Sequence, residues 1–216
     1  PWDSEHNKAL IAKMPAVYAS PALGETLKAK GMTSYVVPLS RKPAATLKPK
    51  ADAPAPGGAP PASSEMVFDD PEGVKFSKIT DGTSNTIAMS ERIWSGNYSI
   101  RAANGEDARE VTVVNVSSVL TNPASCLAKA TVDSVFNVQI KARFGGSWPD
   151  GQAERMGFTT ILPPNKVSCV IDSNINADSQ GGILNASSNH PGGVMGLMAD
   201  GSVRFITNSI PLDTYR

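Results

Sequence analysis

Two apolar runs near the C-terminus, residues 194–199 and 203–206, flank an Asp200-Gly201 pair. Asp-Gly between apolar runs predicts a β-hairpin, because a type I′ turn needs two residues that tolerate positive φ. We therefore expect a hairpin whose alternate residues lie on the core face. His190 precedes this hairpin by a few residues, and we expect backbone hydrogen-bond partners for its imidazole. The pattern assigns a structural role to His190, Asp200 and Gly201.

Shorter patterns predict the other elements of the fold. A helix is expected over residues 2–13, with Asp3 or Ser4 as its cap. One helical turn is expected over residues 123–129, capped by Asn122. Apolar and β-branched runs predict short strands over residues 33–37, 86–90, 111–119 and 158–162. Residues 136–144 alternate between apolar and polar side chains, which predicts one half-buried strand. Asp81-Gly82 has the chemistry of a second turn.

One short helix followed by many short strands indicates an α+β fold with a mainly antiparallel sheet. The 216 residues suit a single domain over positions 1–216. Residues 42–64 contain many alanines and prolines and cannot form a core, so we expect a surface loop insertion there. A partner-binding polyproline segment is the alternative, but no aromatic or arginine-flanked PxxP pattern specifies a partner.

The composition excludes several function classes. Twenty basic residues balance twenty acidic ones, so no global field recruits nucleic acid. Charged residues make up only 19 %, whereas glycine and proline number 18 and 17, which favours a turn-rich, exported β domain. No apolar run is long enough to span a membrane. The chain begins at Pro1 without an initiator Met, which indicates a fragment or a processed form.

The sequence contains little catalytic chemistry. No glycine-rich phosphate loop occurs, and Ser187, Ser188 and His190 are neighbours in sequence without evidence of triad geometry. We therefore predict no catalytic, cofactor-binding or metal-binding residue. Oxygen-bearing side chains alternate in a way that resembles a calcium loop, at Asp172, Asn174, Asn176 and Asp178. The glycine and the distal glutamate of an EF-hand are absent, which favours a solvated polar loop.

Five segments of the chain resemble the DUF1559 proteins and occur in the same order as in that family. They are residues 1–18, 79–91, 146–151, 159–169 and 188–206. The DUF1559 proteins are a planctomycete-type family of prepilin-processed, pseudopilin-like proteins. The last segment contains the spacing His-x9-Asp-Gly. The resemblance implies a pseudopilin-like head, located in the periplasm or at the cell surface of a bacterium. Family members begin with a hydrophobic helix that is missing here, and we expect membrane contact only through that helix.

Cys126 and Cys169 are the two cysteines of the chain. Two lone cysteines are usually free thiols in cytosolic proteins and usually pair in exported ones. The export implied by the family resemblance therefore favours a disulfide. A zinc site is not expected, because neither cysteine has a further ligand at the required spacing.

Two function classes remain after these exclusions. The resemblance implies a non-enzymatic, extracytoplasmic structural subunit of a secretion or surface-filament system, with other protein subunits as its partners. The alternative is an exported solute- or glycan-binding module, with Trp94, Tyr98 and Trp148 as candidate stacking residues. Ordinary packing is the simpler interpretation of these scattered aromatics.

Overall fold

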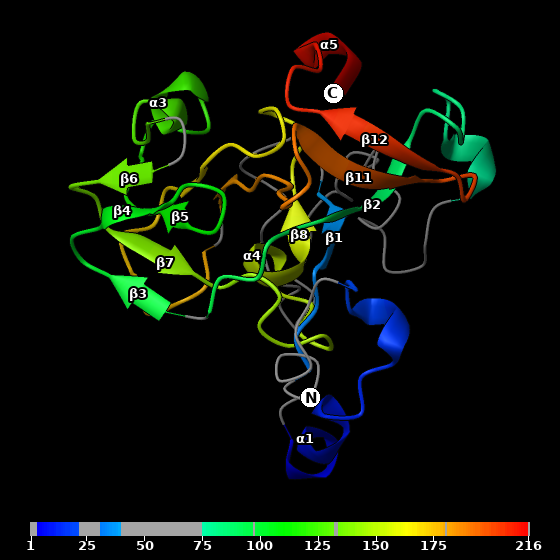
Figure 1. The fold of residues 1–216 in the computed structure, drawn as a ribbon, viewed down its shortest axis with the longest axis horizontal. Helices are drawn as coiled ribbons and strands as arrows, with labels where there is room; N and C mark the ends of the chain where they lie inside the picture. Colours follow the sequence, from blue (N-terminus) through cyan, green and yellow to red (C-terminus); the bar gives the residue numbers. More distant parts are fainter. Residues whose placement is uncertain are drawn as a thin grey trace, which may run out of the picture.

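The computed structural model describes residues 4–21, 31–39, 75–96, 98–131, 134–179 and 181–215. Two five-stranded sheets occupy opposite halves of the molecule (Figure 1). The first sheet has the order β12 (Val203–Thr207), β11 (Gly193–Met198), β2 (Ile87–Glu91), β1 (Tyr35–Pro38), β8 (Gly157–Phe158). The second has the order β10 (Gly182–Ile183), β9 (Ser168–Val170), β5 (Thr112–Val113), β7 (Ile140–Ala142), β3 (Tyr98–Ile100).

The remaining described elements are small. β4 (Asn104–Asp107) pairs with β6 (Ser134–Phe136), and the α-helices are α1 (Glu5–Ile11), α3 (Ala124–Leu127), α4 (Ala153–Met156) and α5 (Leu212–Tyr215). Two 3-10 turns, Ala16–Tyr18 and Phe76–Lys78, complete the set. Most strand pairs are antiparallel; β1–β8 and β5–β9 are parallel. The expected α+β, mainly antiparallel class is confirmed. Within the described ranges, no helix has both the length and the apolar character needed to cross a bilayer.

The C-terminal hairpin is confirmed, but its turn differs from the expectation. The Gly201 N–H donates to the Met198 carbonyl over 2.9 Å, and Gly201 has φ 85°. Positive φ at described non-glycine positions occurs only at Asn115, Asn137 and Asn165. A type I′ turn needs positive φ at Asp200 as well, so that prediction is wrong. A three-residue loop closed by a left-handed glycine connects the strands instead.

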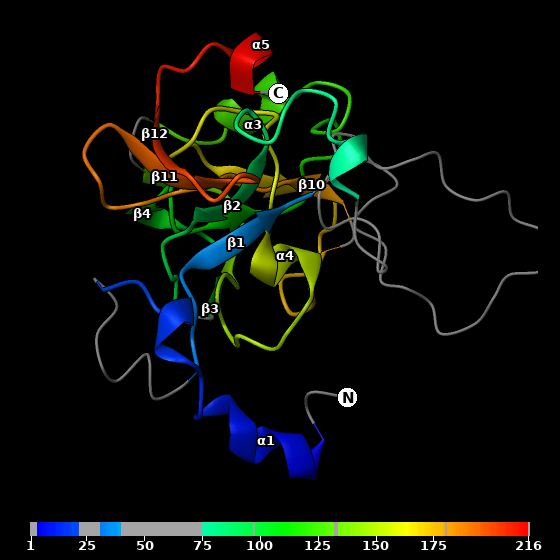
Figure 2. The same cartoon turned by 90° about the vertical axis from the view of Figure 1, so that its right-hand side faces the viewer.

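The N-terminal elements follow the predicted order. Helix α1 is shorter than the expected range, and the Ser4 hydroxyl caps it by accepting the Asn7 N–H; Asp3 lies outside the described residues. Strand β1 pairs with β2 and β8, so its partners come from beyond the Ala/Pro-rich stretch. That stretch, residues 42–64, lies outside the described residues. Figure 2 shows α1 set apart from the two sheets.

The alternating run at 136–144 does not form one strand. Strand β6 ends at Phe136 and β7 begins at Ile140, because Asn137 adopts φ 55° and breaks the extended backbone. Phe136 is 46 % exposed although the alternation places it inside, and Lys141 is fully buried although the alternation places it outside. The prediction of a half-buried strand is wrong because side-chain pairing, not periodicity, decides the burial of Lys141.

Three other predicted elements are shorter than expected. Strand β5 covers only part of residues 111–119, since Asn115 turns the backbone with φ 60°. Strand β8 shares only Phe158 with the predicted range 158–162, because its partner β1 also ends there, so residues 159–162 are not a strand. Helix α3 begins after Pro123, which occupies the cap position expected for Asn122.

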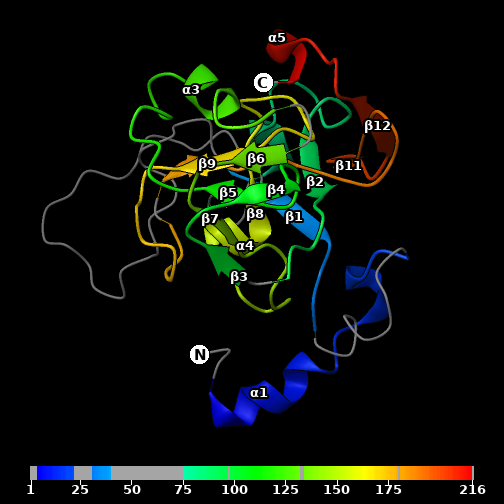
Figure 3. The same cartoon turned by 60° about the vertical axis from the view of Figure 1, so that its left-hand side comes forward.

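A disulfide fastens α3 to β9 in the core of the second sheet. Cys126 and Cys169 are joined at 2.05 Å, with their Cα atoms 5.7 Å apart, which confirms the predicted pairing. Both residues are fully buried among apolar side chains that include Val113, Val135 and Ile140. Figure 3 shows α3 above β9, the two elements that the bridge joins.

Arg92 connects the two sheets. Its guanidinium donates to the Gly157 carbonyl over 3.0 Å and to the Ser168 hydroxyl over 2.6 Å. It also lies 2.9 Å from the centre of the Phe144 ring. Burial lowers the pKa of Arg92 well below its usual value, and the charge of Glu154 opposes that shift. Arg92, which directly follows β2, thus bonds to β8 of the first sheet and to β9 of the second sheet.

Candidate functional site

The two most distinctive motif segments of the sequence, residues 79–91 and 188–206, are neighbours in the fold. Strands β2 and β11 pair antiparallel, with Leu197 opposite Met89. At one end of the pair, His190 Nε2 lies 3.6 Å from Glu91 Oε1. The Met195 N–H donates to the same Glu91 oxygen over 2.7 Å. The start of the second motif is therefore held by the end of the first.

At the opposite end of the same strand pair, the two Asp-Gly turns meet. The Asp200 N–H donates to the Thr83 carbonyl, and the Ala199 N–H donates to the Thr86 carbonyl over 2.8 Å. The first turn is closed by the Asn85 N–H, which donates to the carbonyl of Gly82, a residue with φ 87°. The Asn85 side chain also donates to the Asp81 carbonyl. Both turns thus set the register of one antiparallel unit.

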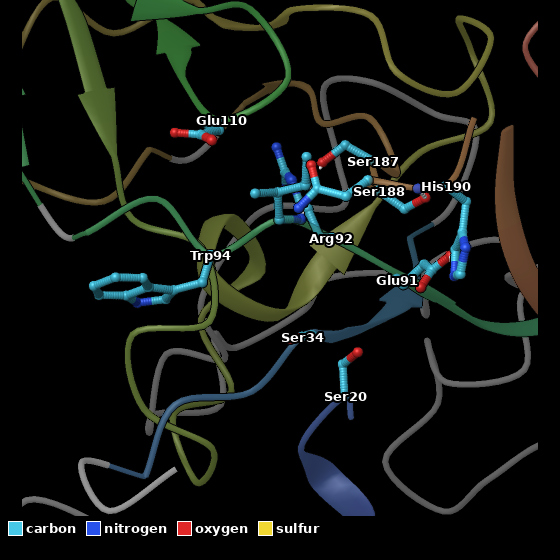
Figure 4. Close-up of a pocket in the computed structure, with 11 residues that line it drawn as sticks. Ser20, Ser34, Glu91, Arg92, Trp94, Glu110, Ser187, Ser188 and His190 are labelled. Carbon is cyan, nitrogen blue, oxygen red and sulfur yellow. Dashed lines mark hydrogen bonds and ion pairs between the residues drawn. The ribbon is translucent and has the colours of Figure 1, made fainter. Parts of the chain in front are cut away.

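Two cavities adjoin the His190–Glu91 pair. The polar pocket, about 470 Å³, lies between the end of β2 and the 187–190 loop, and its lining is Ser20, Ser34, Glu91, Arg92, Ile93, Trp94, Glu110, Ser187, Ser188, Asn189 and His190. Figure 4 shows the His190 ring beside Glu91 and the Trp94 ring at the far end. The pair separates this pocket from a second one.

The apolar pocket, about 420 Å³, lies on the outer face of the first sheet. It shares Ser20, Glu91 and His190 with the polar pocket, and its other lining residues are Pro21, Tyr35, Met89, Ser90, Met195, Leu197 and Val203. Polar and apolar cavities therefore meet at one carboxylate–imidazole pair. Such a junction can receive a segment or ligand that has one polar and one apolar part.

The hydroxyls next to His190 are bonded to backbone groups. Ser187 Oγ donates to the Arg109 carbonyl and accepts the Ile93 N–H. Ser188 Oγ donates to the Gly193 carbonyl and accepts the backbone N–H of His190. The imidazole faces Glu91, which corrects the expectation of backbone partners for the ring. The geometry observed here does not aim the imidazole at a serine nucleophile.

Carboxylates dominate the electrostatics of the polar pocket. Burial raises the pKa of Glu110, and the nearby charge of Asp107 raises it further, although Arg109 opposes the shift. Burial, followed by the charge of Glu110, raises the pKa of Tyr98. The Arg92 guanidinium also lines the pocket but bonds to the Gly157 carbonyl and the Ser168 hydroxyl, so the pocket presents two carboxylates, Glu91 and Glu110, and one cation that is already hydrogen-bonded.

The three candidate stacking residues do not form one platform. Trp148 stacks on Tyr18 with ring centres 5.6 Å apart, and its indole N–H donates to the Ile11 carbonyl. It therefore packs the N-terminal segment against the domain. Trp94 lines the polar pocket, whereas Tyr98 lies on β3 of the second sheet. Of the three, Trp94 is placed where a ligand in this pocket would touch it.

The loop that resembles a calcium site is held by cationic side chains. Arg143 donates to the Ile175 carbonyl, Lys141 donates to the Ala177 carbonyl, and Arg155 pairs with Asp178 at 3.1 Å. Three positive charges already occupy the inner side of this loop, which disfavours a divalent cation there. Within the part of the chain that the structure describes, no three potential metal ligands gather at one point.

The comparison with protein families gives a match over nearly the whole chain. The family described as "Protein of unknown function (DUF1559)" matches residues 1–213. The chain belongs to the DUF1559 family. No curated protein and no solved structure matches it.

In this DUF1559 protein, sequence reasoning identified His190 but missed its partners. Glu91 lies just beyond the predicted strand 86–90 and is the last residue of the observed strand β2; only the pairing of β2 with β11 brings it to His190. Glu110 comes from a segment without a clear pattern. The available signal was the presence of both motifs in one chain, which could have indicated that they are adjacent strands.

Proposed function

We propose that this DUF1559 protein is a non-enzymatic, extracytoplasmic structural subunit of pseudopilin-like type, which assembles with other protein subunits of a secretion system or surface filament. The observation that carries the proposal is the open outer face of the first sheet. The following contacts and exposures support it.

The outer face is apolar across four neighbouring strands. Its register brings together Tyr35 of β1, Met89 of β2, Met195 and Leu197 of β11, and Val203 and Phe205 of β12. Val203 is 59 % and Phe205 47 % exposed, and the other four are partly exposed. Contiguous exposed apolar surface of this kind is typical of protein–protein contacts in soluble domains.

The opposite face of the same sheet already has its packing partners. Val36, Val194 and Ile206 are buried there in one apolar cluster with Phe158 and Tyr215. The open face is therefore not needed for the core of the domain. An apolar surface that the core does not use is available to another subunit.

The disulfide supports the proposed compartment. Disulfides persist in oxidising environments such as the periplasm or the cell surface and are rare in the bacterial cytosol. The Cys126–Cys169 bridge is fully buried, so its role is structural. A structural bridge of this kind fits an exported subunit better than a cytosolic enzyme.

Site-specific photocrosslinking in the producing cells tests the proposal. A photoreactive phenylalanine replaces Leu197 on the open face, and the matched control replaces Phe76, an exposed apolar residue (72 %) outside that face. We expect crosslinks from position 197 to subunits of an extracytoplasmic assembly, and none from position 76. A chain that fractionates as a cytosolic monomer, without crosslinks from position 197, would overturn the proposal.

The polar pocket favours solute or glycan binding as a second candidate function. The indole of Trp94 and the carboxylates of Glu91 and Glu110 line one cavity, and these are groups that stack on and accept hydrogen bonds from a sugar. A glycan array followed by titration calorimetry tests it. Trp94→Ala should abolish any binding, whereas Trp148→Ala should not, because Trp148 contacts Tyr18 and Ile11 and does not line the pocket. No bound glycan on the array would remove this candidate.

A further inference from the structure

Strand β12 is the edge of the first sheet. It pairs with β11 on one side; on the other side the one described backbone bond to it comes from the following turn, where the Ile210 N–H donates to the Thr207 carbonyl over 3.1 Å. The strand contains one charged residue, Arg204, and neither proline nor a bulge in its pairing with β11. Natural edge strands usually carry such features to prevent pairing with another chain. The edge of β12 is therefore unprotected.

The hydrogen-bond pattern shows which groups point outward. The Met198 N–H donates to the Ser202 carbonyl, and the Asn208 N–H donates to the Gly192 carbonyl. Bonded and non-bonded pairs alternate along an antiparallel ladder, so Arg204 and Ile206 use their backbone groups toward β11. Val203, Phe205 and Thr207 direct their N–H and C=O groups away from it. Of these groups the Thr207 carbonyl already accepts the Ile210 N–H, and the others bond to no described backbone group.

An independent contact agrees with this assignment. Met195 lies opposite Phe205 in the ladder. Its N–H donates to Glu91 Oε1, and its carbonyl accepts the Ser90 hydroxyl, so both groups point toward β2. They are not available to Phe205, whose own backbone groups therefore face the free edge.

We propose that two copies of this chain associate through antiparallel pairing of their β12 strands, about a two-fold axis between the two Phe205 residues. This proposal rests on the proposed function, because it identifies a second copy of the chain as one of the subunits that this domain binds. The two first sheets become one continuous sheet across the axis.

Backbone geometry selects this register. With Phe205 opposite Phe205 of the second copy, Val203 lies opposite Thr207 at both ends, and every outward N–H finds an acceptor in about six hydrogen bonds. Two of these go to Thr207 carbonyls, which accept the Ile210 N–H as well. A shift by two residues leaves one outward residue of each strand without a partner. A shift by one residue places each outward-facing residue opposite a residue whose backbone groups are already bonded to β11. The centred register is the one that satisfies every outward group.

The side chains are compatible with the same register. Phe205 is 47 % exposed, and the two phenyl rings lie on the same face at the axis, where aromatic pairs are favourable. Arg204 lies opposite Ile206 of the second copy, so no two like charges are directly opposed. This self-complementarity favours a second copy over an unrelated strand as the occupant.

Charge exchange at position 205 tests the register. The whole chain is studied with its disulfide intact by sedimentation velocity, and we expect the unmodified protein to dimerise. Phe205→Lys and Phe205→Glu should each weaken the dimer at least about tenfold, because each places like charges opposite one another. An equimolar mixture of the two variants should restore a dimer.

Position 203 supplies the matched control. Val203→Lys and Val203→Glu also add charge to the exposed edge, but residue 203 faces residue 207 in the proposed register, so mixing these two variants should restore less association than mixing the 205 pair. Amide hydrogen exchange provides a second readout. The amides of Val203, Phe205 and Thr207 should become protected as the protein concentration rises.

A protein that remains monomeric up to about 1 mM would overturn the proposal. So would a dimer that persists in Phe205→Lys, or a mixture of 205 variants that stays monomeric. These outcomes leave the photocrosslinks from position 197 unaffected, so a failed edge contact and a failed subunit role can be told apart.

Discussion

The two sheets differ in how their strands are buried. In β11 of the first sheet, buried residues alternate with partly exposed ones between Val194 and Met198. In β5, β7, β9 and β10 of the second sheet, every residue is buried. These four strands are covered on both faces, and only β3 at the edge of the second sheet is partly exposed. Among the described residues, the first sheet has one apolar face open. We call the second sheet the closed sheet and the first sheet the open sheet. The closed sheet contributes most to stability, and the open sheet provides the surface that we propose for assembly.

The interactions that hold each sheet follow from this difference. The closed sheet contains a disulfide and a buried ion pair, Lys141 with Glu154, whose side chains are both fully buried. The open sheet relies on turn geometry and register, set by Gly201, Gly82 and the Glu91–Met195 contact. Substitutions should therefore be most costly in the closed sheet and least costly at the pocket of the open one.

Removal of Glu154 should have the largest effect. Glu154 Oε2 accepts Lys141 Nζ over 2.9 Å and the Ser179 N–H over 2.6 Å. Glu154→Ala leaves the lysine charge buried without its partner and should cost about 3–5 kcal/mol in urea unfolding. The double variant Lys141→Met/Glu154→Leu should lose less than the single one. Equal losses would show that the ion pair does not dominate this site.

Removal of the disulfide should follow closely. The bonded cysteines are 43 positions apart, for which the chain-entropy model gives roughly 4 kcal/mol. Cys126→Ala/Cys169→Ala should lower the free energy of unfolding by about 2–4 kcal/mol. The control is the unmodified protein under reducing conditions, which should approach the variant. Two free thiols in a titration of the denatured, unreduced protein would contradict the bridge.

A substitution in the hairpin turn of the open sheet should cost less. A Cβ at Gly201 meets no atom within 4 Å, so any penalty comes from its φ of 85°. Gly201→Val should cost about 1–2 kcal/mol, and Gly201→Asn clearly less, since asparagine tolerates positive φ. Thermal unfolding of both variants measures the difference. Equal costs would show that backbone conformation is not the cause.

The smallest effect is expected at the pocket. The His190 side chain is 55 % exposed and lies 3.6 Å from Glu91, so His190→Ala should cost no more than about 0.5 kcal/mol. Glu91→Ala should cost more, because Glu91 also accepts the Met195 N–H. A His190 variant that keeps its full melting temperature but loses a measured binding activity would make the motif a binding site and not a structural one.

Local chemistry made part of the fold predictable. Ser4 capping, the Asp200-Gly201 hairpin and the helical turn around Cys126 depend on neighbouring residues, and all three are present in the structure. The alternation of β11 was readable because only one face of the first sheet is covered by the core. The pairing of Cys126 with Cys169 needed, in addition, the compartment implied by the family.

Tertiary structure decided the features that depend on partners distant in sequence. Lys141 is buried because α4 brings Glu154 to it, and no periodicity signals that contact. His190 faces Glu91 because β2 and β11 pair across about a hundred residues, a juxtaposition set by sheet topology alone. The sequence by itself determined the Ser4 cap of α1 and the position of the C-terminal hairpin. Which strands became neighbours, and which charges were buried between them, was settled only when the two sheets packed together.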